Sequence, residues 1–279
     1  MLEAAIDFGG TLTKVIVASR DGETRWTGPS PAQPQPSDVA DLLASAGCPD
    51  PGALSLLAVT GGRSAQFALD WEGVSVLAID EAEATAHGGL LGGAQAPAIV
   101  VSIGTGTGIV LVREDGSFER LIGSGIGGGT ALGLARLLLG EQSVAAYGQL
   151  AAAGSVQNCD LTVGDILGSG TGPVPADGTA AHFGRIGAPE GAGASPADQM
   201  AAIVGMVSQN AVRVALGEIG THGASSLILL GGFLAEPGFR AAIEASPFFQ
   251  RFPVPIAEMP QYAVVRGALA AARRRREQP

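Results

Sequence analysis

The feature that most constrains the fold is a strand–glycine turn–strand pattern that occurs twice in the chain. The first copy has the turn Asp7–Thr11 and the second has Ile103–Gly108, each between two short apolar runs. Two apolar runs joined by a tight polar turn predict a β-hairpin. No internal repeat with a period of about 20–50 residues is present, so the hairpins indicate two αβ halves instead of a repeat protein.

The remaining pattern predicts one αβ unit at residues 1–95, a hinge at Ala94–Pro97 and a second unit at 96–265. The segment 266–279 is expected to end a helix that returns toward the first unit. Residues 29–37 and 168–193 are rich in turn-forming residues and are expected to be loops. Expected strands lie at 2–6, 14–18, 54–59, 74–79, 98–101, 109–112 and 226–230; expected helices lie at 38–46 (with Ser37 as N-cap), 130–139, 197–217 and 262–276.

Composition excludes several classes of function. The 279 residues are 46% hydrophobic and 15% charged, with a formal net charge of −10. Such a chain is globular and has no general attraction for nucleic acid or an anionic membrane, so we expect neither as a partner. Cys48 and Cys159 are the only cysteines and are expected to be reduced. The first residues lack a basic stretch followed by an apolar one, so the expected location is the cytoplasm.

The first turn carries the groups that a phosphate site needs. Gly9 and Gly10 allow backbone amides to approach an anion, and Thr11 and Thr13 supply hydroxyl donors. Lys14 is the only lysine in a chain with 15 arginines, which indicates a need for a compact point charge. Asp7, at a strand end, is a candidate to hold Mg²⁺ through water. An ordinary hairpin turn remains the alternative.

Three further glycine clusters fit the same interpretation. Gly104 and Gly106 lie in the second turn, and Gly127–Thr130 precedes a helix whose first amides are expected to meet an anion. Gly231-Gly232 follows a strand and offers a flat approach for a nucleotide base. Each cluster taken alone is equally compatible with a plain turn or linker.

A group of carboxylates follows the apolar strand at 74–79. Glu81 lies just after the strand end, where site residues of open α/β sheets are often found. It is our candidate for the group that acts on a reacting hydroxyl. Asp80 and Glu83 are alternatives for that role or for holding the metal. The non-catalytic alternative is an acidic first helical turn that only stabilises the helix.

The chain resembles the type II pantothenate kinases over nearly its whole length. The Arg120…Gly127–Leu134 and Pro173–Gly184 blocks are the most discriminating. The matching stretches, in chain order, are Ile6–Lys14, Thr60–Gly62, Glu81–Ala84, Ile103–Gly106, Arg120 with Gly127–Leu134, Asp160-Leu161, Pro173–Gly184 and Leu230–Phe233.

The resemblance implies a two-lobed α/β fold of the actin-like ATPase (ribonuclease H-like) type, with ATP in an interlobe cleft. The implied reaction is ATP-dependent phosphorylation of pantothenate to 4′-phosphopantothenate, the first step of coenzyme A biosynthesis, with ATP and Mg²⁺ as cofactors. It also implies a homodimer and makes acetyl-CoA and CoA candidate inhibitors, while the sequence leaves open whether either one inhibits. The apolar helix at 197–217 is the candidate interface, although a helix buried inside its own domain would show the same pattern.

By the same resemblance, Glu81 is the catalytic carboxylate, Arg120 and Thr105 bind pantothenate, and Asp7 is the metal-binding residue. The implied ATP-binding residues are Phe8, Gly9, Gly10, Thr11, Leu12, Thr13, Lys14, Gly104, Thr105, Gly106, Gly128, Gly129, Thr130, Tyr147, Gly231 and Gly232.

Two other functions remain open from the sequence. One is a different small-molecule kinase of the same fold, such as an N-acetylhexosamine kinase; Arg120 and the Pro173–Gly184 block favour pantothenate over it. The other is a non-catalytic nucleotide-binding sensor, against which the intact Asp7, Lys14 and Glu81 argue.

Overall fold

The computed structural model describes residues 2–62, 74–172, 174–188 and 193–277. Its first lobe is built on a mixed sheet with the strand order β3-β2-β1-β4-β5, in which β1, β2 and β3 are antiparallel and β1, β4 and β5 are parallel. The strands are β1 (Leu2–Phe8), β2 (Leu12–Ser19), β3 (Gly22–Pro29), β4 (Leu54–Thr60) and β5 (Ser75–Ala78).

Alternation along β1 gives the first sheet two buried faces. Ile6 and Phe8 pack on one face with helix α1 (Pro36–Ser45), while Ala5 belongs to the cluster on the other face. Because side chains alternate along a strand, Asp7 shares the face of Ala5. That face is turned toward the second lobe, which places the Asp7 carboxylate at the boundary between the lobes. A 3₁₀ turn, η1 (Pro51–Ala53), leads into β4.

The second lobe is built on a sheet with the order β11-β6-β7-β8. Its outer face carries helices whose apolar side chains form one core with Ile99, Val101 and Leu111. The strands are β6 (Ala98–Ile103), β7 (Thr107–Val112), β8 (Phe118–Arg120) and β11 (Ser226–Leu230); the helices are α3 (Gly128–Leu139), α4 (Val144–Ala153), α6 (Pro196–His222), α7 (Pro237–Ala245) and α8 (Pro247–Arg251).

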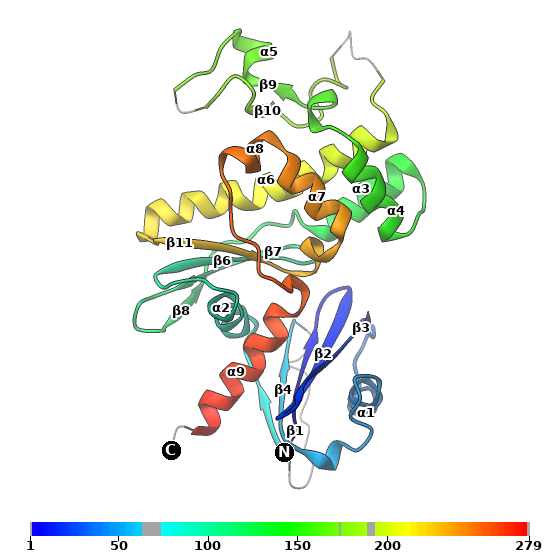
Figure 1. Ribbon diagram of the computed structural model, residues 1–279, viewed down its shortest axis with the longest axis vertical. Coiled ribbons are helices and arrows are strands. Elements are labelled where there is room, and N and C mark those ends of the chain that lie inside the picture. Colours follow the sequence, from blue (N-terminus) through cyan, green and yellow to red (C-terminus); the bar gives the residue numbers. More distant parts are fainter. Residues whose placement is uncertain (1, 63–73, 173, 189–192, 278–279) are drawn as a thin grey trace.

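Helices α2 (Glu81–Leu91) and α9 (Ala263–Glu277) join the two lobes (Figure 1). A single apolar cluster contains residues of both sheets together with residues of α2 and α9. The two helices approach very closely: a Cβ atom at Gly267 would lie 1.9 Å from the carbonyl oxygen of Ala84. The C-terminal helix also packs on β1 and β4, so its apolar side chains cover one face of the first lobe's sheet.

A small subdomain lies at the end of the molecule farthest from the first lobe (Figure 1). It contains η3 (Val156–Asn158), β9 (Leu161–Thr162), α5 (Val163–Leu167) and β10 (Thr179–Ala181), with β9 and β10 antiparallel. Residues 168–193 were expected to be an irregular loop, and β10 is the regular element within the described part of that range. Two further 3₁₀ turns, η4 (Gly232–Ala235) and η5 (Pro260–Tyr262), follow β11 and precede α9.

The α6 helix is long and apolar enough to cross a membrane by length and composition. However, 67% of its apolar window is buried inside the structure, as in the core helix of a globular protein. Ile203, Val207, Ala211 and Val212 are fully buried in the core of the second lobe. Their apolar character is therefore explained within one chain and is no longer evidence for a dimer interface.

Candidate active site

A cleft of about 430 Å³ lies between the lobes and collects most of the residues that the sequence singled out. Elements of the first lobe, α2 and the second lobe all contribute to its walls. Of the predicted residues, those lining it are Asp7, Gly9, Gly10, Thr11, Leu12, Lys14, Glu81, Gly104, Thr105, Gly106, Arg120, Gly128, Gly129, Gly231 and Gly232.

The first polar pair of the cleft follows from strand register. Asp7 and Lys14 are directly opposite on β1 and β2, so their side chains leave the same face of the sheet. Lys14 Nζ donates to Asp7 Oδ2 at 3.1 Å, and both side chains are largely buried. At the end of the parallel strand β4, Gly61 has φ +97° and a Cβ there would lie 2.7 Å from Asp7 Oδ1. A glycine at this position therefore leaves room for the carboxylate.

The two glycine hairpins meet across the cleft. Thr11 Oγ1 and Thr105 Oγ1 are 2.9 Å apart, one from each hairpin. A Cβ at Gly10 would lie 3.0 Å from Thr105 Oγ1, so the close approach depends on the small residue. This hydroxyl contact joins the lobes where both glycine turns line the cleft.

The glycine loop before α3 supports the second hairpin. The amides of Gly128 and Gly129 donate to the carbonyl oxygens of Gly104 and Thr105, at 2.8 and 2.9 Å. The expectation that these two helix-terminal amides receive an anion is therefore wrong for this structure, because hairpin carbonyls already occupy them. Both glycines still line the cleft.

Four predicted ATP-binding residues do not line the cleft. Phe8 is fully buried in the core with α1. The Thr13 hydroxyl is buried and lies 3.0 Å from Ser30 Oγ, which in turn donates to the Gly9 carbonyl. Thr130 bonds within its own loop, to Gly125. Tyr147 is a core residue of α4 whose hydroxyl donates to the Gly140 carbonyl. These side chains support the hairpins and helices, and we assign them no direct contact with a ligand.

Glu81 is the first residue of α2 and lines the cleft between the lobes. An ideal Cβ built at Gly62 would lie 4.0 Å from Glu81 Oε2, which places the carboxylate beside the end of β4. Partial burial between the lobes, followed by the negative charge of Asp7, raises the pKa of Glu81; Arg120 and Lys14 oppose the shift. A carboxyl with a raised pKa in a cleft is typical of an acid–base group.

The two alternative carboxylates have other partners. Asp80 is the N-cap of α2 and its Oδ1 accepts from the Ala82 amide at 2.7 Å. Glu83 is buried and forms an ion pair with Arg275 of α9, away from the residues that line the cleft. Glu83 is therefore no longer a candidate base or metal ligand.

Arg120 ends β8 and lines the same cleft as Glu81. Its Nη2 lies 3.7 Å from Asp80 Oδ1, and its side chain is 55% exposed. An open and weakly paired guanidinium is available to a carboxylate on a ligand.

The sequence missed three cleft residues near Gly231-Gly232, namely Val144, Glu236 and Phe239. Phe233, which belongs to the Leu230–Phe233 motif, lines the same part, and its ring is 5.2 Å from that of Phe239. The Leu230–Phe233 motif pointed to the region. The contributions of α4 and α7 depend on tertiary packing that the motif does not encode.

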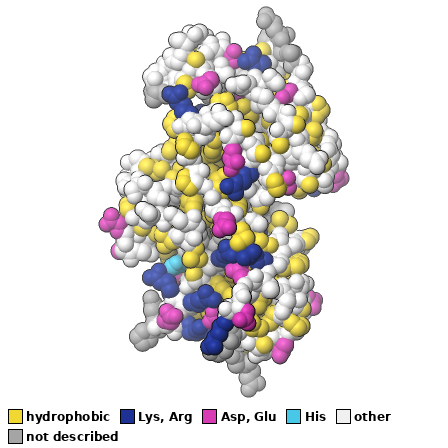
Figure 2. All heavy atoms as spheres, viewed as in Figure 1, with side chains coloured by type: hydrophobic (Ala, Val, Ile, Leu, Met, Phe, Trp, Pro, Cys, Tyr) yellow, Lys and Arg dark blue, Asp and Glu magenta, His cyan; other side chains and the backbone are white. Residues whose placement is uncertain are grey.

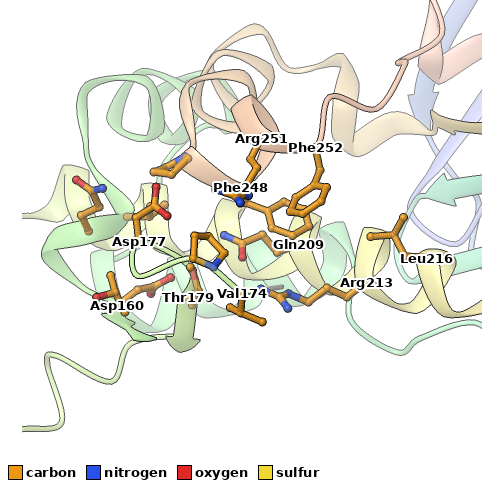
Figure 3. A pocket seen from close by; sticks show the side chains of 16 residues that line it. Asp160, Val174, Asp177, Thr179, Gln209, Arg213, Leu216, Phe248, Arg251 and Phe252 are labelled. Atoms are coloured by element: carbon orange, nitrogen blue, oxygen red, sulfur yellow. The ribbon is translucent and has the colours of Figure 1, made fainter. Parts of the chain in front are cut away.

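A second pocket of about 180 Å³ lies outside the cleft, between α6, α8 and the 174–179 segment (Figure 3). Within the Pro173–Gly184 block, whose residue 173 lies outside the described residues, Val174 and Thr179 line this pocket. Asp160 anchors the block: its Oδ1 accepts from the Phe183 amide and its Oδ2 lies 2.9 Å from His182 Nδ1. The described residues of the block therefore do not line the cleft of this chain.

Fold and cleft together define the class of protein. The β3-β2-β1-β4-β5 sheet, the second four-stranded sheet and two hairpins facing one cleft make up the two-lobed actin-like ATPase fold. The activator of the 2-hydroxyisocaproyl-CoA dehydratase from Clostridium difficile, solved with bound ADPNP, has this fold. It aligns with a TM-score of 0.65 and 16% identity, over 100% of this chain and 98% of its own.

Sequence comparison gives the family. The Fumble family model matches residues 91–242, more than half of the chain. The type II pantothenate kinase of Oceanobacillus iheyensis is 34% identical over 184 residues, 64% of this chain and 67% of that protein. Pantothenate kinase 1 of rice is 36% identical over 141 residues, 50% of this chain but 21% of the much longer relative. The chain belongs to the Fumble family, that of the type II pantothenate kinases.

Proposed function

We propose that the protein transfers the γ-phosphoryl group of ATP to pantothenate, giving 4′-phosphopantothenate. The observation that carries the proposal is Glu81, a carboxylate with a raised pKa that shares one cleft with Lys14 and both hairpins. Phosphoryl transfer to a hydroxyl needs charge neutralisation, positioning and a group that accepts the hydroxyl proton. This cleft supplies candidates for all three.

Charge neutralisation falls to the first lobe. Lys14 would contact the transferred phosphoryl group, and the backbone of the two hairpins, which lines the same cleft, would bind the phosphates. Mg²⁺ neutralises phosphate charge when it is bound, and Asp7 is the residue that would hold it, through water. The described residues contain no group of three or more metal-binding side chains. One carboxylate fits a Mg²⁺ ion that takes its other ligands from phosphates and water.

Positioning of the acceptor falls to the wall that carries Arg120 and Thr105. The Arg120 guanidinium would bind the pantothenate carboxylate, which in a chain of net charge −10 needs a local cation. Glu81, near the same wall, would then accept the proton of the reacting hydroxyl. The arrangement separates the anchor of the substrate from the group that acts on it.

We propose further that the protein is a cytoplasmic homodimer and that CoA or acetyl-CoA inhibits it. For the dimer, the supporting observation is now apolar surface beside the second pocket, where Leu216 and Phe252 are 40% and 41% exposed. For the inhibitor and the location, the support is the family resemblance.

An ADP-release assay with a panel of acceptors tests the proposed function. Pantothenate should give saturable ADP release, while N-acetylglucosamine and N-acetylmannosamine should give none above background. Release with an N-acetylhexosamine alone would establish the other kinase activity. ATP binding without turnover on any acceptor would instead indicate a nucleotide sensor.

A further inference from the structure

Glu236 is a cleft residue to which neither the motifs nor the proposed chemistry assigns a role. It directly follows η4, the turn that begins at Gly232, and is the N-cap of α7. Its Oε1 accepts from the Gly238 amide at 3.3 Å. The side chain is partly buried and lines the cleft from the second lobe.

Close packing of two helices fixes the position of this carboxylate. A Cβ at Gly148 of α4 would lie 2.2 Å from Glu236 Oε1, 2.8 Å from its Cδ and 3.0 Å from its Cγ. A Cβ at Gly238 of α7 would in turn lie 2.1 Å from the Gly148 carbonyl oxygen. The carboxylate of Glu236 therefore packs directly against the backbone of α4 at Gly148.

The carboxylate has hydrogen-bonding capacity to spare. Among the described residues it forms no ion pair, and the Gly238 amide is its one hydrogen-bond donor. An ionised carboxylate offers about four acceptor positions, so one long hydrogen bond leaves most of them to solvent or a ligand. A partly buried carboxylate that accepts only one hydrogen bond favours a ligand with hydrogen-bond donors.

The surroundings restrict what that ligand is. Val144, Phe233 and Phe239 give this end of the cleft apolar walls suited to a flat base. The amino group of adenine is a poor partner for a carboxylate, because each of its edges pairs the N–H donor with an acceptor nitrogen; amide side chains match that pattern instead. A vicinal diol offers two O–H donors and no such conflict.

We propose that Glu236 binds the 2′- and 3′-hydroxyls of the nucleotide ribose. The inference rests on the proposed use of ATP and adds a recognition role to that site. It also gives the cleft an electrostatic direction: phosphates are drawn to Lys14 of the first lobe and repelled from Glu236 of the second. The nucleotide is thereby oriented with its sugar at α7 and its phosphates at the hairpins.

Calorimetric titration of the full chain with ATP, 2′-deoxy-ATP and 3′-deoxy-ATP tests the proposal without relying on turnover. Glu236→Gln keeps the size of the side chain and an oxygen for the Gly238 amide. We expect it to weaken ATP binding about 3- to 10-fold, as for loss of a charge-assisted hydrogen bond, while at least one deoxynucleotide changes less than about 2-fold. Glu244→Gln is the matched control, because Glu244 lies on the same helix and pairs with the exposed Arg240; it should bind all three like the wild type.

Gly148→Ala is the second variant, since the nearest atoms to its added methyl group are all in the Glu236 side chain. It should displace the carboxylate and reduce the preference for ATP over the deoxynucleotides in the same way. Equal weakening of all three nucleotides by Glu236→Gln would overturn the ribose assignment and indicate a purely structural N-cap. A loss that disappears only with purine riboside triphosphate, which lacks the amino group, would overturn it in favour of base recognition. If the wild type binds ATP in none of these titrations, the proposed function itself fails and this inference with it.

Discussion

Glu81 shows at the scale of one residue how a site can be inferred from local pattern and still depend on distant neighbours. Its position after an apolar strand was readable from the sequence. Its raised pKa was not, because the shift comes first from burial between the lobes and then from Asp7, which is 74 positions earlier in the chain (81 minus 7). The sequence also does not show that Gly61, just after β4, leaves room for the Asp7 carboxylate, because the two residues are far apart in the chain.

A raised pKa means that the charge on Glu81 destabilises the folded protein. The folded state holds the proton more tightly than the unfolded state, so stability falls as pH rises from the unfolded value near 4.5 through the folded pKa. Glu81→Gln should therefore raise Tm at pH 7, and the difference should vanish near pH 4. Thermal unfolding of both proteins across this range checks it; a lower Tm for the variant at pH 7 would show that the Glu81 charge is stabilising.

Arg120 is expected to act on the substrate and not on the fold. Arg120→Ala should raise KM for pantothenate by about 10-fold or more, as for loss of a charge-assisted contact, with a much smaller effect on pantetheine, which lacks the carboxylate. Steady-state kinetics with both substrates provide the measurement. Equal effects on the two would assign Arg120 to positioning Asp80 or to the phosphate side of the cleft.

At the scale of elements, the sequence predicted those whose pattern is local. Both hairpins, β4, β11 and the long helices are present near the expected positions, although α1 begins at Pro36 with Gln35 as its N-cap instead of Ser37. The β3 strand was missed because its residues, apart from Trp26, are mostly polar and exposed, as suits a sheet edge.

Tertiary packing explains the other omissions. Helices α4, α7 and α8 are short, and their places are set by contacts with α6 and with one another. Thr13 and Tyr147 carry hydroxyl groups that could bind a nucleotide, but both side chains are buried inside the protein. The strand and helix periodicity of the sequence did not show that they are buried instead of lining the cleft. The Pro173–Gly184 block identified the family and yet lies beside another pocket.

The α9 helix is joined to the first lobe by ion pairs as well as by its apolar face. Arg266 binds both oxygens of Glu23 on β3, and Arg273 and Arg276 bind Glu3 on β1. Figure 2 shows acidic and basic side chains interspersed over the part of this face where α9 meets the first lobe. Arginines 273–276 are thus largely paired and are not simply a solvated helix end.

Removing one of these pairs should have a small, pH-dependent cost. Burial acts to raise the pKa of Glu23, but hydrogen bonds from Arg266 and Arg25 outweigh it and lower the pKa. Arg266→Gln should therefore reduce stability by about 0.5–1 kcal/mol at pH 7. The loss should fade as pH falls below 4.5 through the folded pKa of Glu23.

Chemical denaturation at several pH values measures the effect of Arg266→Gln. Arg113→Gln is the control, because Arg113 pairs with the exposed Glu119 within one hairpin of the second lobe, and this ion pair does not connect the two lobes. A pH-independent loss in the Arg266 variant would mean that packing of the side chain, not its charge, stabilises the helix.

The two large sheets of the molecule are held together by α2 and α9, and the cleft lies between the hairpins. Most apolar side chains of α6 are buried internally, so the candidate dimer surface is limited to Leu216, which is exposed near the end of α6, and the exposed Phe252. Light scattering at micromolar concentration should give twice the 27.8 kDa chain mass. Leu216→Arg should shift the protein toward the single-chain mass; a wild type that is already monomeric would remove the dimer from the account.

The proposed reaction is phosphorylation of pantothenate in this cleft, with Glu81 as the base. Mass-spectrometric quantification of 4′-phosphopantothenate formed from ATP and pantothenate by the wild type and by Glu81→Gln, with ATP binding measured on both, tests it. We expect product from the wild type, a roughly 10²- to 10⁴-fold lower rate from the variant, and similar ATP affinity for the two. Absence of product from wild-type protein that binds ATP, or equal rates from the two proteins, would contradict the proposal.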